Sequence, residues 1–150
     1  MFSGITGITK KTGKTVNLVV DTSVWSHFLR RMNRDKNSPY VKQLYYHLER
    51  QDCIHLLGVI IQELLDGIKL SRQFELITEY FEPFPLIDHT REDFIEAARL
   101  KNKCRKKGIQ AGSIDFLIAS VCINRNFPLL TAADDFAYIA KHCDLLVIKP

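Results

Sequence analysis

The sequence predicts an α/β fold, a three-layer α/β/α sandwich with a mostly parallel central sheet. From residue 17 onward, short apolar runs of strand type alternate with segments whose apolar residues recur at helical spacing. No repeat or linker interrupts this alternation, and strands that alternate with helices form mostly parallel sheets covered on both faces. We therefore expect one domain over residues 17–150. A flexible basic tail, rich in Gly, Thr and Lys, is expected over residues 1–16.

The individual elements follow from apolar spacing and from boundary residues. Ser38 and Pro39 are typical of a helix start, Thr90 opens a long helix that Gly108 ends, and Ser113 is the expected cap of the next helix. The apolar pattern predicts strands at 17–20, 53–57, 84–87, 128–131 and 145–148. It predicts helices at 25–32, 38–48, 59–70, 73–81, 90–107, 113–123 and 134–141.

Length, composition and net charge indicate which class of protein the sequence encodes. The chain has 150 residues, of which 46% are hydrophobic and 25% charged, as in one ordinary globular domain. No apolar run is long enough to cross a bilayer, and the N-terminus lacks the apolar segment of a signal peptide. Cys53, Cys104, Cys122 and Cys143 have no disulfide or zinc spacing, so we expect reduced thiols in a cytoplasmic protein. The net charge of +4 mildly favours a polyanionic partner.

Acidic residues follow the ends of predicted strands or begin predicted helices. Asp21 comes directly after the run Leu18–Val20, and Glu63 lies one turn into an apolar helix. Asp115 and the pair Asp134–Asp135 stand at helix starts. The carboxyl ends of parallel strands meet at one edge of a sheet, where such sheets bind ligands. Clustered carboxylates repel one another, and a hard divalent cation is the usual reason for them.

Taken singly, each of these acids has a simpler interpretation. Asp21 could cap the helix that follows it, and Glu63 could be a solvated helix residue. Asp115 and the Asp134–Asp135 pair could complement helix dipoles. We also expect the helix start at Ser113 to keep Asp115 ionised.

Four segments together resemble the PIN-domain ribonucleases, most closely the VapC toxins of bacterial toxin–antitoxin pairs. The segments are Asp21–Trp25, Glu63–Gly67, Ser113–Ala119 and Leu129–Phe136, and the resemblance runs from about residue 17 to the C-terminus. It implies an endoribonuclease dependent on Mg²⁺ or Mn²⁺ that cuts single-stranded or structured RNA, such as tRNA or mRNA. It also implies a cognate antitoxin that covers the groove near Asp21.

The resemblance assigns roles to particular side chains. Asp21, Glu63 and Asp115 match the metal-binding acids of the family. Thr22, Ser23 and Thr131 would orient the metal's water ligands or the scissile phosphate, although helix capping and a strand end explain them equally well. A metal held by carboxylates can neutralise charge on the phosphate and lower the pKa of bound water, so no His or Lys has to act as the base.

The fourth acid departs from the family pattern. Ala133 occupies a position where family members usually carry an acid or Asn, whereas Asp135 matches the acid before the phenylalanine. We prefer Asp135 over Asp134, which stays the fallback, because Phe136 should anchor the short helix and so fix its neighbour. Successive helical residues point about 100° apart, so the two acids should not both face one metal.

Two further features suggest partners. Lys101, Lys103, Arg105, Lys106 and Lys107 form a dense basic run, and Arg30, Arg31, Arg34 and Lys36 form a second cluster. Either could bind RNA phosphates in a salt-dependent way, or be only a solvated surface. The early helices also hold more aromatic side chains than one small core needs, which suggests a homodimer bound by the antitoxin; these residues are Trp25, Phe28, Tyr40, Tyr45 and Tyr46.

Three other functions remain open from the sequence. Ala133 is compatible with a PIN-like module that binds RNA or protein without cleaving it. A nuclease of the same fold that acts on DNA is also possible. A receiver domain of two-component signalling would use Asp21, Asp88 as the phosphoacceptor, Thr131 and Lys149. Against this, the chain ends at Pro150, where a receiver needs a closing helix.

Overall fold

The computed structural model describes residues 13–30 and 38–150, so most of the expected tail, together with Met32, Arg31, Arg34 and Lys36, lies outside the described residues. Within that part, the strands are β1 (Asn17–Val20), β2 (Cys53–Leu57), β3 (Leu86–Ile87), β4 (Leu129–Leu130) and β5 (Val147–Ile148). The helices are α1 (Thr22–Arg30), α2 (Pro39–Glu49), α3 (Gly58–Leu65), α4 (Ser71–Phe81), α5 (Arg91–Lys106), α6 (Ser113–Arg125) and α7 (Asp134–Ala140).

The five strands form a parallel sheet in the order β3-β2-β1-β4-β5. β1 is the central strand, in register with β2 through the pair Leu18–Ile54 and with β4 through the pair Val20–Leu130. After β1 the chain adds β2 and β3 on one side, and then crosses to add β4 and β5 on the other. The order therefore reverses between β1 and β4, and their carboxyl ends open onto the crevice where such sheets bind ligands.

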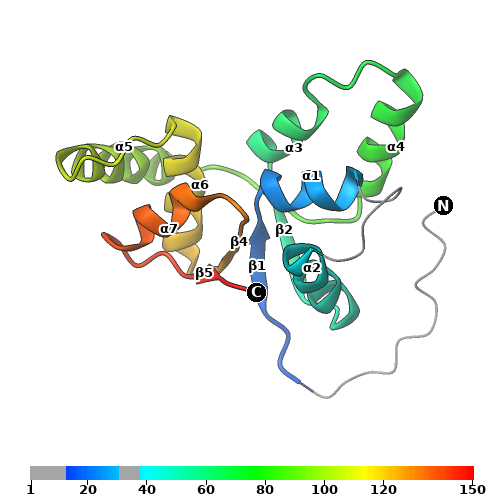
Figure 1. Cartoon of the computed structure of the whole chain (residues 1–150), viewed down its shortest axis with the longest axis horizontal. Coiled ribbons are helices and arrows are strands. Elements are labelled where there is room, and N and C mark those ends of the chain that lie inside the picture. Colours follow the sequence, from blue (N-terminus) through cyan, green and yellow to red (C-terminus); the bar gives the residue numbers. More distant parts are fainter. Residues whose placement is uncertain (1–12, 31–37) are drawn as a thin grey trace.

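Helices cover both faces of the sheet, which confirms the predicted three-layer α/β/α architecture. In Figure 1, α1 to α4 lie on one side of the strands and α5 to α7 on the other. Contacts agree with this division, since α1 packs on α2 and α3, while α6 packs on α5 and α7. The sheet is entirely parallel, as expected for strands joined by helical crossovers.

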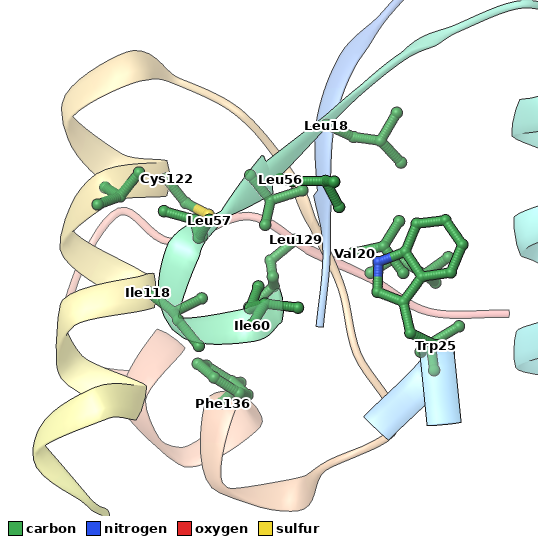
Figure 2. Close-up of a cluster of buried hydrophobic side chains, with 14 of the residues drawn as sticks. Leu18, Val20, Trp25, Leu56, Leu57, Ile60, Ile118, Cys122, Leu129 and Phe136 are labelled. Atoms are coloured by element: carbon green, nitrogen blue, oxygen red, sulfur yellow. The ribbon is translucent and has the colours of Figure 1, made fainter. Parts of the chain in front are cut away.

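The core lies on both faces of β1. Figure 2 shows Ile60 near Ile118 and Phe136 on one side, and Trp25 on the other. The ring of Trp25 meets that of Phe81 edge to face, with centroids 5.0 Å apart. Trp25 and Phe28 are buried, so these two aromatic residues of the early helices belong to the core. Tyr40 packs partly against it, whereas Tyr45 and Tyr46 are about half exposed.

Most predicted elements are present, but several boundaries differ. The helix predicted for 59–70 ends at Leu65, because the chain turns at Gly67 with a φ of +82°. The strand predicted for 84–87 is reduced to β3, since Phe84 packs among the aromatic rings around Trp25. The last two predicted strands are also shorter than expected. Gly112 is the residue before α6, and Ser113 is its first helical residue, not its cap.

The strand order excludes a receiver domain. Receiver domains have the order 2-1-3-4-5, in which the phosphoacceptor after the third strand lies next to the first. Here β3 is an edge strand beside β2, so Asp88 follows a strand that β2 separates from β1.

Two remaining expectations concern cysteines and membranes. The four cysteines are free; Cys104 and Cys122 are buried, while Cys53 and Cys143 are half-buried. Among the helices of the described residues, none combines the length and apolar character that a membrane span requires.

Candidate active site

Asp21 follows β1 directly, at the crevice between β1 and β4. Its backbone N–H donates to the carbonyl of Leu130 at 2.9 Å, which extends the pairing of the two strands by one residue. Its carboxylate is buried, at 5% exposure. The hydroxyls of Ser23 and Thr131 both donate to its Oδ2, at 2.7 and 3.0 Å. Asp21 is therefore held from the start of α1 and from the end of β4, and no ion pair of the described residues involves it.

Ser23 and Thr131 also connect the two loops that flank Asp21. The Ser23 hydroxyl oxygen accepts the backbone N–H of Ala132 at 2.9 Å. The hydroxyl oxygen of Thr131 accepts the N–H of Ala133 at 3.0 Å. These bonds couple the start of α1 to the loop before α7. Ser23 and Thr131 thus contact the Asp21 carboxylate directly and hold its orientation.

Glu63 reaches the same region from α3. The hydroxyl of Thr22, the residue after Asp21, donates to Glu63 Oε2 at 2.6 Å. Glu63 is exposed to solvent. The bond from Thr22 nevertheless ties its carboxylate to the segment that carries Asp21, 41 residues earlier in the chain.

Asp115 is the third residue of α6 and is half-buried. Its Oδ2 accepts the backbone N–H of Gly112 at 3.1 Å. Burial raises the pKa of Asp115; the Gly112 N–H opposes this shift, but the negative charges of Asp21, Asp135 and Glu63 add to it. The Gly112 N–H at the helix start therefore favours the ionised carboxylate, as expected, whereas burial and the neighbouring acids oppose it.

The charges that contribute to this pKa shift also identify the acids that lie near Asp115. Three carboxylates that are far apart in sequence all act on one side chain of α6; they belong to Asp21, which follows β1, to Glu63 on α3 and to Asp135 on α7. Asp135 is among them, and both Asp134 and Asp135 are exposed at the start of α7. This favours Asp135 as the fourth acid, a choice that stays a prediction.

The described residues offer these acids no positive partner. The ion pairs of that part of the chain involve other carboxylates, on Asp52, Glu92, Glu96 and Asp93. As the side chains stand, no group of three or more His, Cys, Asp or Glu among the described residues is arranged to hold a metal ion. Metal binding would require the four carboxylates to turn toward a common point. Their oxygen ligands are of the kind that Mg²⁺ and Mn²⁺ prefer.

Two features near the site carried no recognisable sequence signal. Gly112 holds Asp115 through its backbone, which no side-chain pattern could reveal. Cys122 is buried on α6, where its surroundings and the negative charge of Asp21 contribute to a pKa of about 12. Burial is the larger cause, and it keeps this thiol neutral and unreactive.

Comparison with known proteins agrees with this geometry. The family model of the PIN domain matches residues 18–142. No curated protein sequence matches the chain. Among solved structures, VapBC2 from Rickettsia felis, bound to a DNA fragment from its promoter, has a TM-score of 0.71 at 20% identity over 89% of this chain and 98% of that one.

Two further structures have the same fold. VapBC-1 from nontypeable Haemophilus influenzae has a TM-score of 0.70 at 19% identity, covering 89% of this chain and 98% of its own. VapBC-5 from Mycobacterium tuberculosis, a member of the VapBC family of toxin–antitoxin systems, has a TM-score of 0.66 at 20% identity, covering 90% and 99%. With the family model matching 125 residues between positions 18 and 142, the chain belongs to the PIN-domain family.

Proposed function

We propose that this protein is an endoribonuclease that depends on Mg²⁺ or Mn²⁺ and acts as the toxin of a toxin–antitoxin pair. The observation that carries the proposal is the buried carboxylate of Asp21, which the hydroxyls of Ser23 and Thr131 hold at the carboxyl ends of β1 and β4. Glu63 on α3, Asp115 on α6 and Asp135 on α7 add negative charge near it, and no ion pair of the described residues involves any of these four acids. A site of that kind favours a divalent cation and a phosphate substrate.

Asp21, Glu63, Asp115 and Asp135 would hold the cation. When bound, it supplies positive charge that offsets the negative charge gathering on the phosphate during hydrolysis. The chain's own residues then have defined tasks. Ser23 and Thr131 hold Asp21 in orientation through their hydroxyls, and Thr22 holds Glu63. Outer hydrogen bonds of this kind typically contribute 10- to 100-fold in metal affinity or activity.

RNA is the proposed substrate because the chain combines an acidic site with a positive surface. The net charge is +4 even though the site concentrates carboxylates. Lys103, Arg105, Lys106 and Lys107 are exposed near the end of α5. Such residues attract a polyanion and make its binding depend on salt concentration.

An antitoxin and a second copy of the chain are the proposed protein partners. The proposal rests on the fold shared with VapBC structures and on the aromatic surface of α2. Tyr45 and Tyr46 are 47% and 49% exposed, and Tyr45 meets the buried ring of Phe28 edge to face. Sedimentation of the purified chain should show a dimer. A monodisperse monomer at high concentration would remove the dimer from this proposal.

The nuclease proposal is tested with purified protein and end-labelled RNA. Cleavage should require Mg²⁺ or Mn²⁺, stop with EDTA, and be lost in Asp21→Asn while thermal melting still shows a folded protein. Parallel incubation with single-stranded DNA separates an RNA enzyme from a DNA enzyme. Full cleavage in EDTA, or by Asp21→Asn, would contradict the proposal.

A second candidate is a PIN-domain module that binds RNA or protein without cleaving it. Ala133 favours it, because this residue precedes α7 where family members usually carry an acid or Asn. RNA binding by the wild-type chain, without cleavage of any RNA in Mg²⁺ or Mn²⁺, would select this candidate over the enzyme.

A further inference from the structure

A pocket of about 320 Å³ lies between the C-terminal half of α5 and the start of α6. Its lining residues are Lys101, Arg105, Ile109, Gln110, Ala111 and Phe116. Lys101 and Arg105 are four residues apart on α5, so both project from the same face of the helix. Ile109 and Ala111, which are half-buried, supply accessible apolar surface, whereas Phe116 also lines the pocket but is buried. The pocket therefore combines two positive charges with an apolar wall.

The two cations of this pocket are not neutralised by described carboxylates. Arg99, on the same helix, pairs with Glu92 and Glu96. Arg50 and Arg125 pair with Asp52 and Asp93. By contrast, Lys101 donates to the neutral hydroxyl of Ser113 at 2.7 Å, and within the described residues Arg105 forms no ion pair. Their charge is available to an anionic ligand.

The pocket adjoins the candidate active site through the segment 109–116. Ile109, Gln110 and Ala111 line the pocket, and Gly112, the next residue, binds the Asp115 carboxylate. Phe116 lines the pocket one residue beyond Asp115. The segment that lines the pocket therefore continues directly into the residues that hold Asp115, so the pocket and the acidic site are adjacent along the chain at the start of α6.

We propose that this pocket binds one nucleotide of single-stranded RNA beside the scissile phosphate. Lys101 and Arg105 bind its phosphate, and the apolar wall of Ile109 and Ala111 receives its base. The proposal rests on the nuclease function proposed above and adds a substrate position to it. A base needs to be unpaired to enter such a pocket, so the pocket selects single-stranded segments over duplex RNA.

The test is RNA binding in EDTA, where metal-dependent cleavage is suppressed. Binding of a fluorescein-labelled single-stranded RNA to the full chain is followed by anisotropy over a range of salt concentrations. Arg105→Gln should weaken binding about tenfold, the typical effect of one charged hydrogen bond. The slope of log affinity against log salt should become shallower by about 0.7, because one phosphate contact is lost. Arg105 is exposed, so the fold should survive.

Three matched variants distinguish a loss of RNA affinity caused by the pocket from one caused by net charge or by misfolding. Lys106→Gln removes the same charge from the next residue, which is exposed and outside the pocket, and should change affinity far less. Ser113→Ala removes the Lys101 hydrogen bond but no charge, and should leave affinity unchanged. Ala111→Leu fills the apolar wall, and should weaken binding with an unchanged salt slope.

Equal losses of RNA affinity in Arg105→Gln and Lys106→Gln would contradict the proposed nucleotide pocket, because binding would then follow net charge alone. Unchanged affinity in both Arg105→Gln and Ala111→Leu would overturn it as well. These results are independent of cleavage. A wild-type chain that binds RNA but never cleaves it would contradict the nuclease proposal. The binding experiment would still test the pocket in that case.

Discussion

Asp93 and Asp21 are both buried carboxylates, yet of the two only Asp93 has a positively charged partner among the described residues. Asp93, on α5, accepts hydrogen bonds from Arg125 at 2.8 Å and from Asn124 and the N–H of Thr90. Asp21 accepts hydrogen bonds from the hydroxyls of Ser23 and Thr131.

The pKa values of Asp93 and of Asp115, an acid coupled electrostatically to Asp21, shift in opposite directions. Burial alone would raise the pKa of Asp93, but hydrogen bonds from Arg125, Thr90 and Asn124 hold it well below the ordinary value. Asp52 behaves in the same way, through His47, the N–H of Val16 and Arg50. Asp115, beside Asp21, has its pKa raised by burial and by neighbouring acids.

This difference separates carboxylates that hold the fold from the carboxylates that we propose bind a cation. Asp93 joins α5 to α6 through Arg125, and Asp52 joins the end of α2 to the residue before β1. Their negative charge is already balanced inside the protein. The charge at the candidate site is balanced by nothing among the described residues, so it is available to a cation from solution.

The largest expected effect is on activity. Asp21→Asn or Asp115→Asn keeps the shape of the side chain but removes charge from the cation site. Either change should abolish RNA cleavage, exceeding the roughly 100-fold that loss of an outer partner can cost. Cleavage of labelled RNA in Mg²⁺, with thermal melting as the fold control, measures this. Undiminished activity in either variant would remove that residue from the site.

The next effect is on stability. Asp93→Ala leaves Arg125 without its partner and removes the acceptor for the Thr90 N–H, so unfolding should become about 3 kcal/mol easier. Glu92→Ala is the matched control, since the Glu92–Arg99 ion pair is exposed. Urea denaturation gives both free energies. Similar small losses would show that Asp93 is not a structural carboxylate of the kind described.

A smaller effect should distinguish the two acids of α7. If Asp135 is the fourth ligand, Asp135→Asn should weaken Mg²⁺ binding about tenfold, and Asp134→Asn should do little. Mg²⁺ titrations of the thermal melting temperature compare them. The reverse outcome would mean that the loop near Ala133 has shifted to use Asp134. Equal small effects would mean a site of three carboxylates.

The smallest effect is a dependence of stability on pH, with opposite signs for the two kinds of carboxylate. The lowered pKa of Asp93 adds stability above the ordinary value of 3.8 that is lost as pH falls below it. The raised pKa of Asp115 adds stability below 3.8 that is lost as pH rises. Without metal, the Asp115→Asn variant should thus be as stable as wild type at acid pH and more stable at neutral pH. The Asp93→Ala variant should show its largest loss of stability at neutral pH.

Short-range sequence patterns were sufficient to predict most of the helices and strands. Thr90 and Asp93 form the capping box that begins α5, and Gly108 follows its end with a φ of +78°. The strand order could not be predicted, because the pairing of β1 with β4 joins residues more than 100 positions apart. The length of α3 was overestimated, because apolar spacing continues past the turn at Gly67.

The candidate site was predictable as a set of acids but not as an arrangement. Asp21 and Asp115 stand beside strand and helix boundaries, which sequence patterns locate well. The bond from Thr22 to Glu63 and the bonds of Ser23 to the β4 loop depend on tertiary packing. The basic run on α5 looked uniform in sequence, and only the pocket distinguishes Lys101 and Arg105 from their neighbours.

The most direct test of the account is the thermal stability of three proteins with and without Mg²⁺. Wild type and Glu92→Ala should both gain stability with Mg²⁺ in a saturable way, by about 2.7 kcal/mol at a hundredfold excess over Kd. Asp115→Asn should gain little, because its site has lost charge. A wild type that Mg²⁺ and Mn²⁺ leave unchanged, or an Asp115→Asn variant that gains as much as wild type, would contradict the claim that these acids bind a cation.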